Sequence, residues 1–223
     1  MLAATARIFA KVIVGWIALT AVLVVAFRFV PVPVTATMLM DENGITKDWK
    51  SLDNIDRNLV AAVIAAEDSR FCQHSGFDTE AIEQAIRENM EGGRIRGGSS
   101  ISQQTAKNVF LWQGGGYVRK GLEAWFTFWI ERVWGKRRIM EVYLNVAETG
   151  IGTYGAEAGA QRYFGKPAAR LTPNEAARMA AALPSPKTRS VKNPTGWLAG
   201  HGRRIERRLG IVKRDGLDAC VYP

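Results

Sequence analysis

The chain has 223 residues, enough for one domain of ordinary size plus an appendage, and its 30 Lys and Arg against 21 Asp and Glu give a formal net charge of +9. This excess favours an anionic partner, but no known nucleic-acid-binding module is present and the aromatics do not interleave with the basic runs, so no nucleic acid is expected. The two cysteines, Cys72 and Cys220, match no metal-ligand spacing and there are two histidines, which argues against zinc and leaves open whether the cysteines pair.

Near the N-terminus, an uncharged apolar run covers residues 12–27 and is flanked by Lys11 and Arg28. Counted over residues 8–30 it forms a helix about 34 Å long, enough to cross the hydrocarbon core of a bilayer. A cleaved signal peptide and a buried core helix are the alternatives, but the run is long for a signal peptide and no convincing small-x-small cleavage site follows. The sequence therefore predicts a retained single-span anchor. Arg7 and Lys11 favour a cytoplasmic N-terminus, although Arg28 weakens this bias, and the rest of the chain is then expected on the cell-surface side.

With the anchor assigned to residues 1–30, the chain is predicted to continue as a stem over 31–50 and one mainly α domain over 51–223. The stem begins with the proline-punctuated segment VPVPVTATM, which is expected to be extended. No alternating strand pattern of useful length is present. Helices are predicted to end near Glu67 and to cover residues 79–89, 118–134, 136–148 and 196–214, with further helices starting at Ser100 and Thr172.

Two of these helix starts carry capping-box spacing. Ser100 is followed three residues later by Gln103, and Thr172 is followed by Pro173 at the first helical position and by Glu175 three residues after the cap. Both patterns predict a sharp helix N-terminus.

The first helix of the domain ends in two adjacent carboxylates, Glu67 and Asp68, although a helix end normally prefers cations. Glu67 lies four residues after Val63 and three after Ile64, so it faces the buried stripe or its edge. A carboxylate beside apolar surface has a raised pKa, which makes it basic enough to accept a proton near neutral pH. The alternative is a carboxylate that pairs locally, with Arg70 as the obvious partner.

The segment GGSSISQQTAKN places hydroxyl, amide and ammonium groups at the start of a helix. A helix N-terminus with such groups suits an anion, although no nucleotide-binding P-loop pattern is present. The alternative is a well-capped polar helix. The candidate residues are Ser99, Gln103, Gln104, Lys107 and Asn108.

Further along, RKGLE puts Arg119, Lys120 and Glu123 within one helical turn. The plain interpretation is a helix ion pair worth about 0.3–0.5 kcal/mol. The functional interpretation is a second acid held by cations beside an anionic substrate. The aromatics that follow are spread around the helix, so some belong to the core and the rest could meet lipid: Trp125, Phe126, Phe128 and Trp129.

The order of these motifs is more specific than any one of them. E-D-x-x-F-x-x-H-x-G, G-x-S-x-I-x-Q-Q-x-x-K-N, R-K-x-x-E, K-x-x-I-x-x-x-Y-L-N and R-Y-F-G-K follow one another between Glu67 and Lys166. Together they closely resemble the peptidoglycan glycosyltransferase family, which polymerises lipid II and also forms the N-terminal module of bifunctional penicillin-binding proteins. No S-x-x-K or K-T-G motif of a transpeptidase is present, so the chain resembles the stand-alone form.

The resemblance implies a mainly α, lysozyme-like fold and an enzyme anchored in the bacterial inner membrane, with its catalytic domain on the periplasmic or extracellular side. Glu67 falls on the family's general base and Glu123 on its second essential glutamate, while Asp68 is assigned to the substrate site as a support for Glu67. The positions implied to hold substrate phosphates and sugar are Ser99, Gln103, Gln104, Lys107, Asn108, Arg119 and Lys120. Ser100 and Ser102 replace the commoner threonines but keep the hydroxyl.

The same resemblance implies the ligands and partners. The substrates are lipid II and the growing lipid-linked strand, and a divalent cation, magnesium or manganese, is expected at the pyrophosphate with Glu123 able to share in its binding. Penicillin-binding proteins and division or elongation proteins are the expected protein partners. The aromatic helix after Glu123 and the GGRIRGG loop are candidates for a membrane-facing groove and its lid.

Two other functions remain as alternatives. A lysozyme-like lytic enzyme would use Glu67 as an acid and would need no pyrophosphate site, so it should tolerate loss of Lys107 or Arg119. A non-catalytic, membrane-tethered cell-wall scaffold should tolerate Glu67→Gln.

Overall fold

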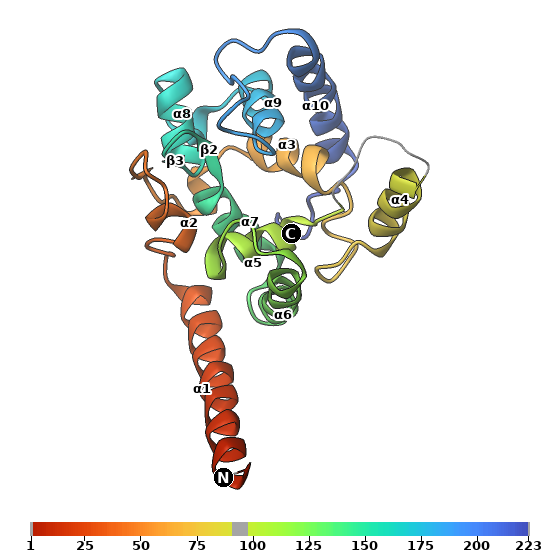
Figure 1. The fold of residues 1–223 in the computed structure, drawn as a ribbon. Coiled ribbons are helices and arrows are strands. Elements are labelled where there is room, and N and C mark those ends of the chain that lie inside the picture. The colour runs from red at the N-terminus through yellow and green to blue at the C-terminus, as the bar shows by residue number, and fades with distance from the viewer. Residues whose placement is uncertain (1, 91–97, 223) are drawn as a thin grey trace.

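The computed structural model describes residues 2–90 and 98–222, and this part of the chain is mainly helical, as predicted (Figure 1). The GGRIRGG segment, predicted as a mobile loop and lid, falls almost wholly outside the described residues. In chain order the elements are α1 (Leu2–Phe29), α2 (Ala36–Leu39), β1 (Thr46–Lys47), η1 (Leu52–Asn54), α3 (Arg57–Glu67), α4 (Thr79–Met90), α5 (Ile101–Phe110), α6 (Gly116–Val133), α7 (Gly135–Val146), β2 (Glu148–Gly150), β3 (Thr153–Tyr154), α8 (Ala156–Phe164), η2 (Ala168–Arg170), α9 (Pro173–Ala182) and α10 (Gly196–Arg214).

The first helix, α1, extends away from the rest of the molecule (Figure 1). Its span Thr5–Phe29 has a mean hydropathy of 2.5 in its most apolar window, and 11% of that window is buried. A core helix would bury most of such a surface, so this alternative does not apply. The helix is long and apolar enough to cross a membrane, as the sequence predicts.

The end of α1 nearest the domain is held by specific contacts with α6 and α7. The indole Nε1 of Trp134 donates to the carbonyl of Val24 over 2.7 Å, and Arg138 Nη2 donates to the carbonyl of Phe27 over 2.9 Å. Farther down the helix, the ring of Trp16 lies 5.2 Å from that of Trp125. The helix α1 therefore packs directly against the domain along part of its length.

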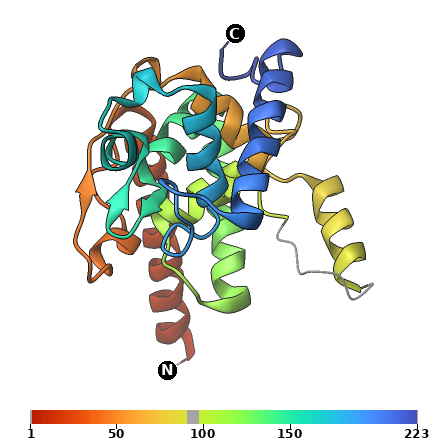
Figure 2. The ribbon, with the colours of Figure 1, turned by 90° about the horizontal axis from the view of Figure 1, so that it is seen from above.

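The helix that ends at Glu67, α3, lies inside the domain. The side chain of Asp56 caps its first turn by accepting from the amide of Asn58 over 2.8 Å. The helix then buries all its residues from Leu59 to Ala65, which is the pattern of a helix surrounded by protein. It packs against α9 and α10, while α5 packs against α6 and α7. Seen from above, α4 stands apart at the side of the molecule, beyond α10 (Figure 2).

A small sheet completes the domain in the order β1-β3-β2, with β1 parallel and β2 antiparallel to β3. Its strands have two or three residues, too few to produce an alternating pattern in the sequence. Strand β1 comes from the segment predicted as a stem, and Val32 and Met38 of that segment are buried. These apolar side chains explain why the segment packs on the domain; its boundary at residue 50 stays a prediction.

The last residues of the described chain are fastened to the loop after α3. Cys72 and Cys220 form a disulfide, which answers the question that the sequence left open. Two residues earlier, the fully buried carboxylate of Asp218 accepts from Arg57 Nε and Nη2 over 2.7 and 2.8 Å. A bidentate ion pair with a buried carboxylate and a covalent bond thus hold the last described residues against α3 and the loop that follows it.

Candidate functional site

Glu67 is the last residue of α3, where the buried helix reaches the surface of a cavity. Its side chain is partly buried, and this burial raises the pKa of the carboxyl above its ordinary value. The amide of Gln104, which donates to Glu67 Oε2 over 2.9 Å, and the nearby charges of Arg189 and Lys107 offset part of that rise. Glu67 is therefore a carboxylate of increased basicity, as its position in the sequence predicts.

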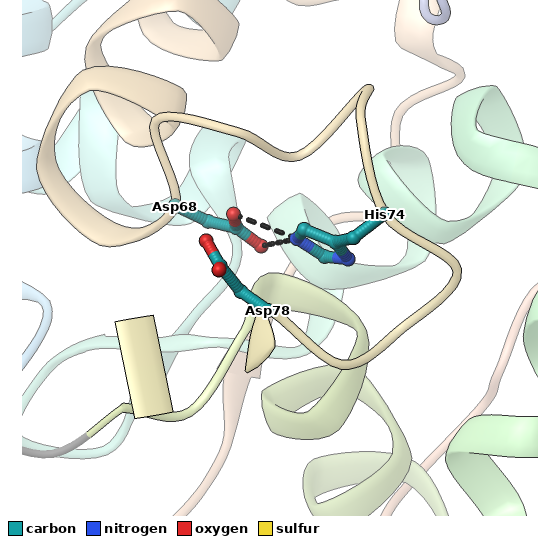
Figure 3. A group of neighbouring side chains, drawn as sticks. All are labelled: Asp68, His74 and Asp78. Atoms are coloured by element: carbon teal, nitrogen blue, oxygen red, sulfur yellow. Dashed lines mark hydrogen bonds and ion pairs between the residues drawn. The ribbon is translucent and has the colours of Figure 1, made fainter. Parts of the chain in front are cut away.

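Asp68 is buried and bonded within the protein (Figure 3). One of its oxygens accepts from the backbone amide of Ile101, the first residue of α5, over 3.0 Å. His74 Nε2 donates to Asp68 over 2.9 Å, and the other ring nitrogen accepts from the amide of Gly76 over 3.2 Å. The carboxylate thus joins the end of α3 to the start of α5. The expected support of Glu67 fits this geometry, whereas direct contact with a substrate stays a prediction.

The loop after Asp68 is tight at Gly76. Its φ is +95°, a value that favours glycine, and an added Cβ would lie 2.8 Å from Thr127 Cγ2 and 2.9 Å from Glu131 Cγ. The glycine therefore lets this loop pass close to α6 while its carbonyl accepts from the hydroxyl of Ser100.

The alternative interpretation of the sequence was a local ion pair between Glu67 and Arg70. The structure shows that Arg70 pairs with other carboxylates. Arg70 binds Asp78 and Glu80 on the far side of the loop, with Nε donating to Asp78 Oδ2 over 3.2 Å. This pairing holds the pKa of Asp78 below its ordinary value. The carboxylate of Glu67 accepts its hydrogen bond from Gln104 and lines the cavity.

The N-terminus of α5 has the predicted capping box. The Ser100 hydroxyl accepts from the amide of Gln103, and Gln103 Oε1 accepts from the amide of Ser100 over 3.0 Å. Both side chains are buried, so Gln103 here closes the helix end. Its neighbour Gln104 points the other way, toward Glu67.

The start of α6 supplies a cluster of cations around a buried acid. Arg119 Nη1 donates to Glu123 Oε2 over 2.7 Å, and Lys120 binds the other carboxylate oxygen. The residue Glu123 is 2% exposed. Lys120 also donates to the hydroxyl of Ser99 over 3.0 Å. Lys107 of α5 lies within electrostatic range of Glu67 and Glu123, and burial lowers the pKa of its ammonium group. Lys107, Arg119 and Lys120 thus form a wall of three cations around Glu123, and Lys107 connects this wall with Glu67.

A polar cavity of about 190 Å³ lies between the end of α3 and the start of α5. Its lining includes Glu67, Asp68, Ser99 and Ser100, together with Arg208 of α10. The sequence drew attention to α10 only as a basic amphipathic helix, and nothing in its pattern singles out Arg208. Arg189, in the loop before α10, was missed for the same reason: its position near Glu67 depends on long-range packing.

The structure thus gathers most of the predicted residues into one site. Asn108 lies half-buried on α5, one residue beyond Lys107. Asp68 and Gln103 are bonded into the scaffold, and Asp68 also lines the cavity. The other residues that belong to the cavity or the cation wall, or that bind one of their members, are Glu67, Ser99, Gln104, Lys107, Arg119, Lys120 and Glu123.

Two acidic groups in the described part of the chain could in principle supply metal ligands, but neither fits a metal ion. Both oxygens of Glu123 are taken by cations, so this side chain does not fit a metal ion as it stands. Asp68, His74 and Asp78 present ligand atoms within 4.8 Å of one another (Figure 3), but the two carboxylates are already bonded to His74, Ile101 and Arg70. Neither group offers the free oxygens that a hard divalent cation needs.

Comparison with known proteins gives one consistent family. The profile of the transglycosylase family matches residues 35–210. Proteins named biosynthetic peptidoglycan transglycosylase match nearly the whole chain. The one from Caulobacter vibrioides is 54% identical over 203 residues, covering 90% of this chain and 89% of the relative, and the one from Rhodospirillum centenum is 50% identical over 219 residues, covering 96% and 95%. A third, from Marinomonas sp., is 46% identical over 195 residues, covering 87% of each.

The close approach at Gly76 predicts a large effect of one added methyl group. Gly76→Ala should destabilise the protein by about 2–4 kcal/mol, because the left-handed conformation and the contact with α6 both oppose a Cβ. Gly114→Ala is the matched control, since Gly114 has a φ of +83° but no atom within 4 Å of the added Cβ. Thermal unfolding of both variants measures the difference. Equal losses of stability would show that the contact with Thr127 and Glu131 carries no cost.

Proposed function

The chain belongs to the transglycosylase family, and we propose that in this peptidoglycan glycosyltransferase Glu67 is the general base of strand polymerisation. The enzyme joins lipid II to the growing glycan by inverting transfer, forming a β-1,4 bond and releasing polyprenyl diphosphate. The observation that supports the proposal is a carboxylate of raised pKa that lines a cavity, with Lys107 of the cation wall in electrostatic range and with Lys120 bonded to Ser99 of the cavity lining. A base and a cationic wall are the two groups that this reaction requires.

The oxygen of the acceptor's 4-hydroxyl attacks the anomeric carbon of the lipid-linked strand, and its proton passes to Glu67. The bond between that carbon and the phosphate oxygen breaks, and the diphosphate leaves with the electron pair. Attack from the face opposite the leaving group inverts the configuration, as in inverting glycosidases, with a sugar hydroxyl in place of water.

The negative charge of the leaving diphosphate would be stabilised by the cation wall. Lys107, Arg119 and Lys120 are placed to bind it, and preorganised charges of this kind stabilise developing negative charge without having to reorganise. Glu123 accepts from two of them and holds them at fixed positions. We therefore assign Glu123 to positioning the wall, since its buried oxygens are occupied by Arg119 and Lys120.

A divalent cation, magnesium or manganese, at the diphosphate remains a prediction from the family resemblance. Because Glu123 is engaged by Arg119 and Lys120, such an ion would have to be held mainly by the substrate's own oxygens. The positive charge of the described site comes from Lys and Arg side chains.

The comparisons give no support to a lytic enzyme or to a non-catalytic scaffold. The relatives are named for biosynthesis, and both candidate glutamates are present in a formed site. The cation wall also has no use in hydrolysis of a glycan, which lacks a diphosphate leaving group.

We propose that the domain lies on the periplasmic or outer side of the bacterial cytoplasmic membrane, with α1 as its anchor. The Cys72–Cys220 disulfide supports this side, because such bonds persist in oxidising compartments and are rare in the cytosol. Protease added to intact spheroplasts should digest the domain. Protection until the membrane is opened would place it in the cytoplasm.

Penicillin-binding proteins and division or elongation proteins remain predicted partners.

Replacing the base tests the central proposal. Glu67→Gln should lower the rate of lipid II polymerisation by about 10²–10⁴-fold, because the amide cannot accept the proton. The measurement is the length and amount of labelled glycan made by purified protein. Glu42→Gln, at an exposed position in the loop after α2, is the control and should keep full activity. A Glu67→Gln enzyme that makes normal glycan would move the base elsewhere.

The two pKa shifts predict the shape of the pH profile. Glu67 works as a carboxylate, so activity should fall as pH drops through its raised pKa, at a higher pH than for an ordinary glutamate. Lys107 works as a cation with a lowered pKa, so its loss of charge should contribute to the alkaline limb. Lys107→Arg should move the alkaline limb to higher pH, because arginine keeps its charge. An unchanged alkaline limb would exclude Lys107 as the titrating group.

A further inference from the structure

Three helices contribute one residue each to a chain of hydrogen bonds that ends on the base. Tyr143 of α7 donates its hydroxyl hydrogen to Gln104 Oε1 over 3.3 Å. Gln104 of α5 donates from Nε2 to Glu67 Oε2 over 2.9 Å. The sequence placed Tyr143 in the Y-L-N block and Gln104 among the substrate-binding residues, but it did not connect either with Glu67.

The direction of this chain is fixed by what each group can do. An ionised carboxylate only accepts, so the NH₂ of Gln104 must face Glu67 and its carbonyl must face Tyr143. Tyr143 is 1% exposed, and burial together with the charges of Glu67 and Asp68 raises the pKa of its phenol well above the ordinary value, so it keeps its hydrogen. Among the residues that the structure describes, Gln104 is the one hydrogen-bond partner of this hydroxyl. Turning the amide over would set its carbonyl against the carboxylate.

The two oxygens of Glu67 are therefore not equivalent. Oε2 accepts from Gln104, whereas Oε1 accepts no hydrogen bond from the described residues. We propose that Tyr143 is a positioning residue, which acts through Gln104 to hold Oε2 and leaves Oε1 to take the proton of the acceptor hydroxyl. This inference rests on the proposed role of Glu67 as the base.

The proposal gives Gln104 a different role from the one that the family resemblance implies. A residue that binds substrate affects mainly KM. A residue that orients the base and supplies a hydrogen bond to its charged form affects kcat and the acid limb of the pH profile. Removing the Tyr143 hydroxyl should weaken the donor strength of the Gln104 amide, because linked hydrogen bonds polarise one another.

The first variant is Tyr143→Phe, measured as kcat against pH at saturating lipid II. We expect kcat to fall about fivefold, the size of one neutral hydrogen bond, with KM unchanged. The acid limb should move to higher pH, because a carboxylate with a weaker donor has a higher pKa. A wild-type acid limb in this variant would overturn the proposal, and so would a rise in KM at constant kcat.

Tyr154→Phe is the matched control. Tyr154 is also 1% exposed, and its hydroxyl donates to Asp41 over 2.7 Å, in a network that does not include Glu67. Both variants lose one buried hydroxyl group, but Tyr154→Phe should keep the wild-type pH profile. The same shift in both variants would show a general effect of the lost hydroxyl and overturn the proposal.

A double-mutant cycle separates action through Gln104 from a structural role of Tyr143. In a Gln104→Leu background, Tyr143→Phe should cause no further loss of kcat, because the link between the tyrosine and the base is already broken. Independent, multiplying losses would make Tyr143 merely structural. Glu67→Gln separates the failure of this inference from the failure of the proposed function. An active Glu67→Gln enzyme would show that Glu67 is not the base. An inactive Glu67→Gln enzyme together with a Tyr143→Phe enzyme that behaves as wild type would keep Glu67 as the base and overturn only the role of Tyr143.

Discussion

The arrangement of the site depends on the hydrogen bonds of the Asp68 carboxylate, which connect α3 with α5. It follows Glu67 directly and accepts from the first amide of α5, so the end of one helix is fixed against the beginning of another. A helix N-terminus favours a negative charge, and a buried carboxylate without such donors would be costly. Because α5 carries Gln104 and Lys107, the same contact sets the distance from the base to its hydrogen-bond partner and to the cation wall. His74 and Gly76 complete this connection from the other side.

Two glutamates of this site show how the surroundings assign a role. Glu67 is half-buried with one amide donor and has a raised pKa, which suits the uptake of a proton. Glu123 is more deeply buried but is bound by Arg119 and Lys120 on both oxygens. In the proposed mechanism, the carboxylate with few donors is the base, and the one between two cations holds them in position. The surroundings of the two side chains would then decide which task each performs.

Much of the fold followed from local patterns in the sequence. The segment 196–214 is helical over the whole predicted range, and both capping boxes form with the predicted partners. These features depend on residues three or four positions apart. The pairing of Cys72 with Cys220, the packing of the supposed stem and the position of Arg208 depend on contacts between distant segments, which composition and periodicity do not encode. For the candidate site, the sequence named most of the residues that the fold brings near Glu67 or Glu123, but it missed Arg189 and Arg208, and the connections to Tyr143, His74 and Ser100 required the fold.

The packing of α1 against α6 and α7 has a mechanical consequence. One helix, α6, carries Arg119 and Lys120 near its start and Trp125 farther along, where it meets Trp16 of the anchor. A helix that spans a bilayer adjusts its tilt to the thickness of the hydrocarbon layer. Because α1 also accepts hydrogen bonds at Val24 and Phe27, a change in its tilt would be passed on to α6, the helix that carries Arg119 and Lys120. In a bilayer, the thickness of the hydrocarbon layer could then act on the position of these cations, and a domain without α1 would lose that connection.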